Sequence, residues 1–175
     1  VYENWVDRAS CNSPWVLGRL TSSTVATTTN GANGQDRSSS FGYDAVTGLL
    51  NRETVEPAAG ASSPLYLNTE YQYDPYGNRT QVTVTGLGLP AAGRVTKTSF
   101  TPASGIAGRF QVWTENGLGH RETYEYYEAT GALRKQTGPN LLPTQWEYDA
   151  FGRKTYELRA DGTCSRSWTR WVGSG

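Results

Sequence analysis

The sequence contains no methionine, one histidine and two cysteines among 175 residues, and its 16 basic residues balance its 16 acidic ones. Two cysteines cannot hold together a disulfide-rich secreted scaffold. A formal net charge of zero gives no basic surface for nucleic acid or an anionic membrane. No apolar run reaches the roughly 20 residues of a membrane span, and the N-terminus lacks a signal-peptide pattern. We therefore expect no nucleic-acid partner and no membrane span.

Residues for catalysis or metal binding are equally scarce. His120 is the only histidine, so the combinations to consider are a Cys11–His120 dyad and an acid–base pair of His120 with Glu122. A polar histidine that begins a strand after Gly119 is expected in solvent instead. One histidine and two distant cysteines also give no cluster of zinc ligands. We predict no catalytic residue, no metal site, no cofactor and no enzymatic activity.

Cys11 and Cys164 lie far apart in the sequence. A disulfide between them would close a long loop and add roughly 4–5 kcal/mol of stability in the chain-entropy model. The favoured interpretation is two small buried thiols on strands, and the pairing stays open. The missing initiator methionine leads us to expect a piece of a longer protein. The final 173–175 stretch, Gly-Ser-Gly, fits either an added linker or a native loop.

Hydrophobic residues make up only 36% of the chain, and aromatic residues 12%, mostly as 11 Tyr and 6 Trp. A mean hydropathy of −0.60 with so much tyrosine and threonine favours pleated, half-buried surfaces over a compact helical core. The 20 Gly and 8 Pro fall between these stretches as turn residues. No segment shows a sustained helical stripe with caps. We predict an all-β fold with almost no helix.

One pattern recurs along the chain: a strand ends in Tyr-Asp, a short turn closes on Gly, and a Thr-rich strand follows. The clearest copies are 73–80 and 148–155, and looser copies lie at 41–50 and 126–133, the last without the Asp. Such recurrence indicates a repeat architecture. The residues assigned to the motif are Tyr43, Asp44, Gly48, Tyr73, Asp74, Gly77, Arg79, Tyr126, Gly131, Tyr148, Asp149, Gly152 and Arg153.

Each residue type has a physical role in a hairpin. The tyrosine ring packs against neighbouring strands, in ring pairs worth about 0.5–1.5 kcal/mol beyond burial. The Asp carboxylate accepts a backbone N–H two residues later and so opens the turn. The glycine adopts the left-handed conformation that closes it. The following arginine lays its stem along the sheet. These roles are structural rather than chemical.

The same reasoning divides the chain into N-terminal strands and a loop over 1–40, repeat hairpins over 41–162, and a closing strand with a linker over 163–175. Residues 16–27 read as one or two strands around a Gly18-Arg19 turn, and 30–36 as a loop. A fifth, degenerate copy places Phe100 at the Tyr position. The predicted hairpins cover 38–55, 71–85, 94–114, 120–137 and 144–159.

These motifs closely resemble the YD repeats of Rhs proteins, of bacterial insecticidal toxin-complex subunits and of animal teneurins, over residues 41–162. The resemblance implies consecutive antiparallel hairpins in one extended curved sheet, within a shell that encloses a C-terminal toxin domain. It also implies a secreted or cell-surface protein whose partners are the rest of that shell and the enclosed toxin. The family's autoproteolytic segment is not visible, and Asp74-Pro75-Tyr76-Gly77, which resembles it superficially, lies within a repeat turn.

Two functions follow as alternatives. The first is a structural fragment of an encapsulating shell. The second is a module that binds a glycan or a cell-surface receptor through exposed Trp and Tyr side chains. The named candidates are Trp113, Trp146, Trp168 and Trp171, all expected on strands. Packing between strands is the competing role of these rings. The ends of the sheet would be unpaired strand edges, so we also expect homo-oligomers formed through them.

Overall fold

The structure is a computed structural model that describes residues 2–5, 16–29, 32–34 and 36–168. The chain divides into two compact units, 1–96 and 97–175, which are treated separately below. Within the described residues, the helical structure is a single 3₁₀ turn, η1 (Pro57–Ala59). No described helix is long and apolar enough to span a bilayer. The prediction of an all-β fold with almost no helix is confirmed.

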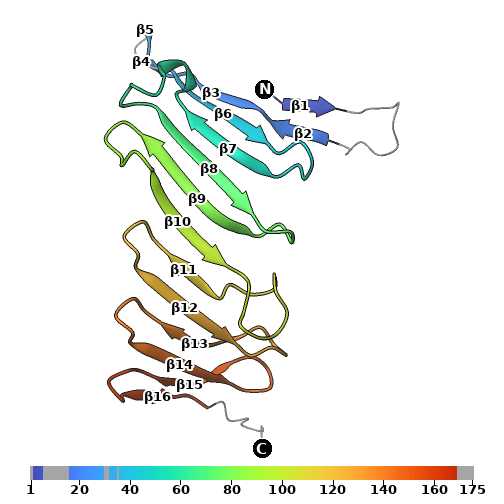
Figure 1. Cartoon of the computed structure of the whole chain (residues 1–175), viewed down its shortest axis with the longest axis vertical. Coiled ribbons are helices and arrows are strands. Elements are labelled where there is room, and N and C mark those ends of the chain that lie inside the picture. The colour runs from blue at the N-terminus through green and yellow to red at the C-terminus, as the bar shows by residue number, and fades with distance from the viewer. Residues whose placement is uncertain (1, 6–15, 30–31, 35, 169–175) are drawn as a thin grey trace, which may run out of the picture. The chain divides into compact units, whose positions relative to one another are not determined.

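Twelve strands form one open antiparallel sheet in the order β16-β15-β14-β13-β12-β11-β10-β9-β8-β7-β6-β3 (Figure 1). From β6 to β16, strands adjacent in the chain are thus adjacent in the sheet, which confirms the predicted succession of hairpins. The strands of the first unit are β3 (Ser22–Val25), β6 (Arg37–Tyr43), β7 (Leu50–Val55), β8 (Leu67–Tyr73) and β9 (Arg79–Gly86). Two further pairs are β1 (Tyr2–Trp5) with β2 (Val16–Leu20), and β4 (Thr28–Thr29) with β5 (Ala32–Asn33).

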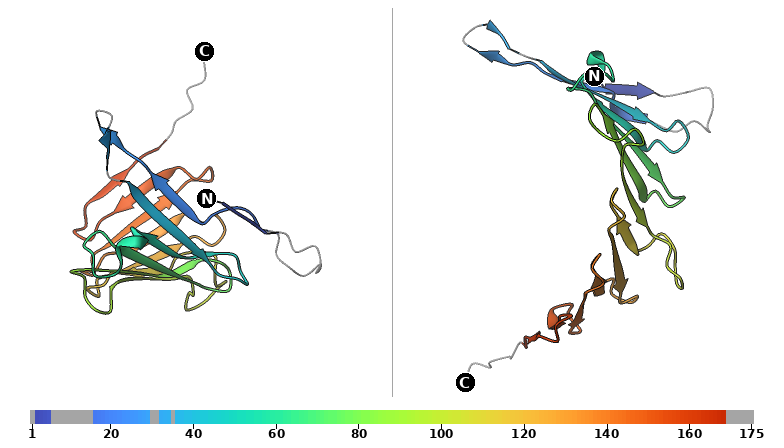
Figure 2. Two further views of the ribbon diagram at one scale, coloured as in Figure 1. Left: turned by 90° about the horizontal axis from the view of Figure 1, so that it is seen from above. Right: turned by 60° about the vertical axis from the view of Figure 1, so that its left-hand side comes forward.

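Strand β10 (Arg94–Ser99) crosses the boundary between the units. The other strands of the second unit are β11 (Trp113–Glu115), β12 (Arg121–Tyr126), β13 (Leu133–Thr137), β14 (Pro143–Tyr148), β15 (Lys154–Leu158) and β16 (Cys164–Arg166). In its described residues this unit is one layer of strands, without a helix or second sheet on either face (Figure 2). Most domains bury a sheet face under a second layer, so this layer is unusually open.

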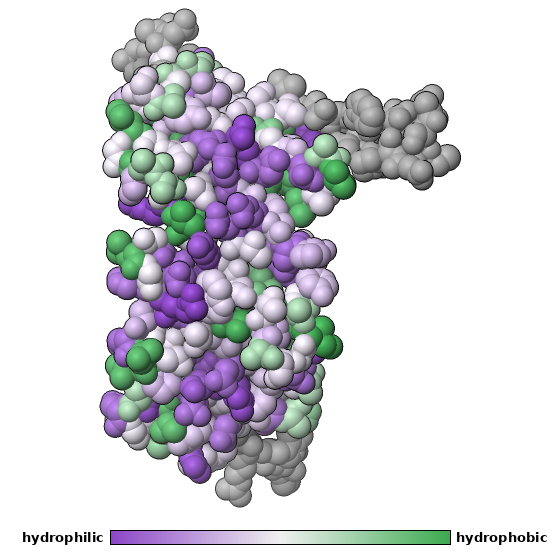
Figure 3. Space-filling model, in the orientation of Figure 1, coloured by the Kyte–Doolittle hydropathy of each residue, from purple (hydrophilic) through white to green (hydrophobic). Residues whose placement is uncertain are grey.

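Half-buried polar side chains take the place of a conventional core. No described side chain is fully buried, and the buried polar residues are Thr54, 7% exposed, and Asn68, 9% exposed. These two residues pair directly on β7 and β8, and Thr54 Oγ1 donates to Asn68 Oδ1 at 3.1 Å. Hydrophilic residues extend over the face of the sheet seen in Figure 3. The sheet is therefore held mainly by backbone ladders and cross-strand side-chain pairs.

The structure corrects several local predictions. Gly18 and Arg19 lie inside β2, and the two expected strands separate at Thr21 instead. The predicted loop 30–36 contains the short strand β5. The strand expected from Arg109 begins only at Trp113, because residues 100–112 form a long loop. Cys164 lies on β16 as predicted, but it is exposed, since neither face of β16 is covered; Cys11 lies outside the described residues.

Candidate functional site

The four tyrosines of the repeat motif occupy one structural position. Each is the last residue of its strand and follows a register shift typical of a β-bulge. Their directly paired residues on the next strand are Leu50 for Tyr43, Arg79 for Tyr73, Leu133 for Tyr126 and Lys154 for Tyr148. The alignment of the four copies therefore matches the geometry, including the copy that lacks Asp.

Three of these tyrosines connect successive hairpins through their hydroxyl groups. Each hydroxyl donates to a backbone carbonyl that precedes its own hairpin. A typical hydrogen bond of this kind contributes about 1 kcal/mol. The bonds are Tyr43 Oη to Leu20 O at 3.0 Å, Tyr73 Oη to Leu50 O at 2.7 Å, and Tyr148 Oη to Leu133 O at 3.0 Å. The sequence analysis gave a role to the tyrosine ring alone and missed its hydroxyl group. The signal for the hydroxyl is the presence of Tyr rather than Phe in each strict copy of the motif.

The fourth copy divides these tasks between two tyrosines. The ring of Tyr126 stacks on Phe110, with centroids 4.9 Å apart and planes at 20°. Tyr127 stands where the other copies have Asp, and its hydroxyl donates to Trp146 O at 3.2 Å. Its ring also meets Tyr148 edge to face at 6.2 Å. Both tyrosines of this copy thus contribute tertiary contacts.

The aspartates close the turns as predicted, and each accepts a hydrogen bond from a second, more distant backbone amide that was not expected. Asp74 Oδ1 accepts the N–H groups of Tyr76 and Asn78, both at 2.9 Å. Asp149 Oδ1 accepts those of Phe151 and Arg153 at the same distance. One carboxylate oxygen therefore closes a five-residue turn by binding the amides two and four positions later. Gly77 and Gly152 supply the left-handed position, with φ of 85° and 78°.

A further copy of this turn lies at the opposite margin of the sheet. Asn116 Oδ1 accepts the N–H groups of Leu118 at 2.9 Å and His120 at 3.1 Å, and Gly119 has φ 79°. Asn-x-x-Gly repeats the spacing of Asp-x-x-Gly, which is the signal that sequence reasoning missed. His120 closes this turn and is exposed, as expected for a solvated histidine.

Hydrogen bonds to the turn carboxylates also set their protonation. The N–H and hydroxyl of Thr47 lower the pKa of Asp44. The N–H of Arg153 lowers the pKa of Asp149. Partial desolvation acts to raise the pKa of Asp74, but hydrogen bonds from Asn78, Tyr76 and Gly77 lower it overall. Each carboxylate is therefore ionised at neutral pH, in the form that accepts the turn amides.

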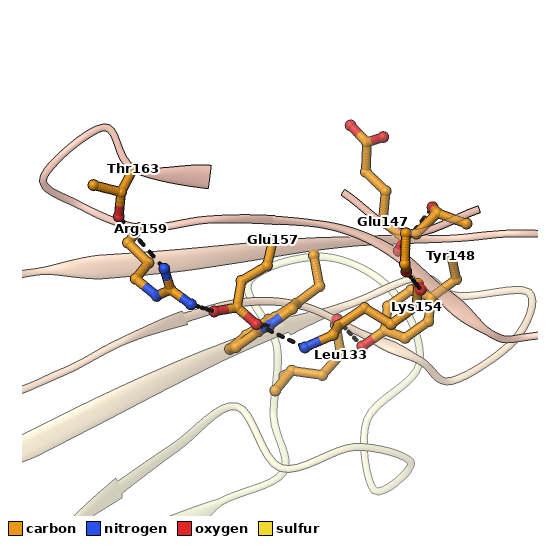
Figure 4. A network of polar contacts seen from close by, with 10 residues as sticks. Leu133, Glu147, Tyr148, Lys154, Glu157, Arg159 and Thr163 are labelled. Carbon is orange, nitrogen blue, oxygen red and sulfur yellow. Dashed lines mark hydrogen bonds and ion pairs between the residues drawn. The ribbon is translucent and has the colours of Figure 1, made fainter. Parts of the chain in front are cut away.

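Glu157 is the centre of a polar network on β14 and β15 (Figure 4). Its carboxylate receives Lys154 Nζ and an Arg159 guanidinium nitrogen at 2.7 Å each, and Trp146 Nε1 at 3.2 Å. The hydrogen bond from Lys154, followed by that from Trp146, lowers the pKa of Glu157. The network fixes the indole of Trp146 across the two strands.

The four candidate tryptophans are placed differently. Trp113 and Trp146 are half-buried on β11 and β14, as expected, and Arg121 lies 4.1 Å from the Trp113 ring. Trp168 is 82% exposed and follows β16 instead of lying on a strand, so its predicted placement is wrong. Trp171 lies outside the described residues. Binding of a glycan by these rings stays a prediction.

A cavity of about 430 Å³ lies beneath the 100–112 loop in the second unit. Its walls include the rings of Phe110, Tyr124 and Tyr126, and the ion pair of Glu125 with Arg134. Burial, with a hydrogen bond to Glu122, raises the pKa of Tyr124 to about 12. Sequence reasoning missed this cavity because it assigned residues 109–112 to a strand. No group of three metal-binding side chains occurs among the described residues.

Neither the protein-family models nor the curated proteins gave a match to this chain. The comparison with solved structures did give matches. The chain is similar to the crystal structure of TcdB2-TccC3 with Cdc42 (TM-score 0.60, 18% identity) and to that of TcdB2-TccC3 (TM-score 0.60, 19% identity). It is also similar to the Photorhabdus luminescens Tc holotoxin pore with the TccC3 mutation D651A (TM-score 0.56, 18% identity).

Each alignment covers 81% of this chain and 7% of the matched chain. The chain thus spans a small part of the length of the toxin-complex chains that it resembles. Identity below 20% establishes the fold and leaves the activity open. The resemblance to insecticidal toxin-complex subunits noted in the sequence is confirmed at the level of the fold, and the chain has the hairpin-sheet fold of a stretch of these toxin complexes.

Proposed function

We propose that the chain is a stretch of wall in an Rhs/YD-type shell that encloses a toxin or effector domain and itself catalyses no reaction. The observation that carries this proposal is the link from one hairpin to the preceding one, made by the hydroxyls of Tyr43, Tyr73 and Tyr148. These bonds add to the backbone ladder at the hairpin ends, where antiparallel sheets fray first. They serve a continuous wall better than a localised site.

The sheet has the properties that containment requires. Its strands lie about 4.8 Å apart and are joined by continuous hydrogen bonds, so a polypeptide cannot pass between them. The turn carboxylates Asp74 and Asp149 keep their hairpins short, and these two hairpins repeat the same few contacts. Repeating one kind of hairpin extends the surface of the wall without requiring new kinds of contact. Nothing in this mechanism needs a reactive side chain.

The toxin-complex structures that share the fold support a toxin context for this chain. On this proposal its partners are the remaining wall and the enclosed domain. Delivery of a toxin to another cell would place the assembly outside the producing cell, in the secreted or cell-surface setting that the sequence resemblance implies.

The test uses the complete polypeptide encoded by the gene that carries this sequence. We expect limited proteolysis to leave a segment beyond the hairpins intact in the native protein and to degrade it once the sheet is unfolded. Combining Tyr73→Phe with Tyr148→Phe should speed this degradation, whereas Tyr126→Phe, the matched control, should not. A polypeptide without a protected segment would overturn the proposal.

A further inference from the structure

The turn at Asn116 contains a reactive dipeptide that the two aspartate turns of the same geometry lack. Asn116 is followed by Gly117, whereas the corresponding positions Asp74 and Asp149 already carry carboxylates. The backbone nitrogen of the next residue can attack Cγ of an asparagine side chain, and glycine favours this attack because it has no Cβ to hinder the approach. The turn is exposed, so water has access to the product.

Three features of the turn favour attack at Asn116. Within the part of the chain that the structure describes, the Gly117 N–H has no hydrogen-bond acceptor, so its nitrogen is not held back. Asn116 Oδ1 accepts the N–H groups of Leu118 at 2.9 Å and His120 at 3.1 Å, and these bonds stabilise the negative charge that develops on Oδ1 during the attack. Nδ2, the leaving nitrogen, lies 3.4 Å from His120 Nδ1, where an imidazolium can donate a proton to it.

A second Asn-Gly pair, at 33–34, provides the comparison. Gly34 N donates to Thr27 O at 2.6 Å, so this backbone bond must break before the nitrogen can attack Asn33. The dipeptide is the same in both places, and the two sites differ in whether the attacking nitrogen is already bonded. The structure therefore ranks Asn116 as the more reactive of the two.

We propose that Asn116 is a deamidation site whose aspartate product forms a third carboxylate-closed turn. A bond forms between Gly117 N and Asn116 Cγ, the bond from Cγ to Nδ2 breaks, and the amide proton leaves with Nδ2 as ammonia. Water then opens the resulting succinimide ring. Hydrolysis of the new bond gives aspartate at position 116, and hydrolysis of the original peptide bond gives isoaspartate. This modification does not depend on the proposed function.

The turn has the geometry that the aspartate product needs. Asp74 and Asp149 close turns of the same spacing, and Oδ1 of each accepts the amides two and four positions later at 2.9 Å. A carboxylate forms stronger bonds of this kind than a neutral amide. The added negative charge lies beside Glu115, which Arg121 already pairs with at 2.9 Å. Isoaspartate instead lengthens the backbone by one carbon and displaces the amides from the side-chain oxygen.

The first test follows deamidation of the native chain at physiological pH and temperature by peptide mass spectrometry, as a gain of about 1 Da. Asn116 should react about fivefold or more faster than Asn33, because the Gly34 nitrogen is held in a hydrogen bond. It should react about tenfold or more faster than Asn140, whose Oδ1 also accepts a turn amide but which a leucine follows. Unfolding in urea should remove the difference from Asn33 and keep the difference from Asn140. Equal native rates at Asn116 and Asn33 would overturn the proposal.

Two variants test the contacts of the turn. Gly117→Ala should slow deamidation about tenfold, and the turn should tolerate it because Gly117 is not in the left-handed conformation. His120→Gln keeps the backbone N–H on Asn116 Oδ1 and removes the imidazole, so it should slow the native reaction about threefold. The rate of this variant in urea should equal that of the parent chain in urea. An unchanged rate in Gly117→Ala would overturn the proposal, and an unchanged native rate in His120→Gln would remove the role of the imidazole.

A third test concerns the product. Asn116→Asp should unfold at a urea concentration equal to or above that of the parent chain, because the carboxylate accepts the same two amides. Asn116→Ala is the matched control: it removes the acceptor and should unfold at a lower concentration. An Asn116→Asp variant as unstable as Asn116→Ala would contradict a turn that accepts the aspartate product.

Discussion

The β12–β13 and β14–β15 hairpins of the second unit carry the same motif and stabilise it differently. In β14–β15, the Tyr148 hydroxyl reaches Leu133 O and the Asp149 carboxylate holds a five-residue turn. In β12–β13, Tyr127 replaces the Asp, and backbone bonds from Tyr127 N to Ala132 O and from Gly131 N to Tyr127 O close the turn.

The β12–β13 hairpin lacks the turn carboxylate, and tertiary contacts from outside the hairpin support it instead. Phe110, from the 100–112 loop, stacks on Tyr126 and approaches Gly131 so closely that a Cβ there would lie 3.1 Å from its ring. A copy without the carboxylate is therefore supported from outside the hairpin. The comparison indicates that the motif has two separable roles: it closes the turn, and it links the hairpin to the neighbouring one. Either role can be taken over by another residue.

Replacing the turn glycines should give the largest difference in stability loss between the two hairpins. Gly131→Ala places a Cβ against Phe110 at φ 73° and should cost about 2–3 kcal/mol, from left-handed strain plus displacement of the ring. Gly152→Ala has φ 78° with no atom within 4 Å of the new Cβ, so it should cost only the strain, about 1 kcal/mol. Urea unfolding of both variants measures the difference, and equal losses would contradict the external support of β12–β13.

Removing the supporting ring tests the same contact from the other side. Phe110→Ala should destabilise the chain by about 2 kcal/mol, less than a fully buried Phe because the ring is only half-buried. Phe151→Ala is the matched control: its ring is 83% exposed, so a loss of at most about 0.5 kcal/mol is expected. A Phe110 variant as stable as the control would mean that the loop merely lies over the sheet.

Acid should weaken the carboxylate-capped turn selectively. Because the pKa of Asp149 is lowered on folding, its contribution to stability is present above the pKa of the unfolded chain and is lost as pH falls through the lower folded value. Stability should therefore hold from neutral pH to about pH 4 and decline below it. Asp149→Asn keeps the Oδ1 acceptor and removes the charge, so this variant should decline less steeply on acid titration followed by circular dichroism. An unchanged acid slope would show that Asp149 has no part in it.

The local part of this structure was predictable from the sequence. The ends of β6, β8, β12 and β14 fall at the predicted tyrosines, because alternation, Asp and Gly act within a few residues of one another. The turn at Asn116 belonged to the same class, and only the substitution of Asn for Asp obscured it.

The tertiary part was not predictable. The path of the 100–112 loop depends on the meeting of Phe110 and Tyr126, which lie 16 residues apart and carry no signal of pairing. The links made by tyrosine hydroxyls join residues up to 23 positions apart, as for Tyr73 and Leu50. Strand periodicity predicts which residues lie on a strand, and it cannot specify which carbonyl a hydroxyl will reach.

The most direct test of the account replaces each repeat tyrosine by phenylalanine and measures the free energy of unfolding. Tyr43→Phe, Tyr73→Phe and Tyr148→Phe should each lose about 1 kcal/mol, because each removes one hydroxyl that links a hairpin to its neighbour. Tyr126→Phe should change stability by less than about 0.5 kcal/mol, because that residue acts through its ring. Equal losses at all four positions, or no loss at the first three, would contradict the claim that these hydroxyls hold successive hairpins together.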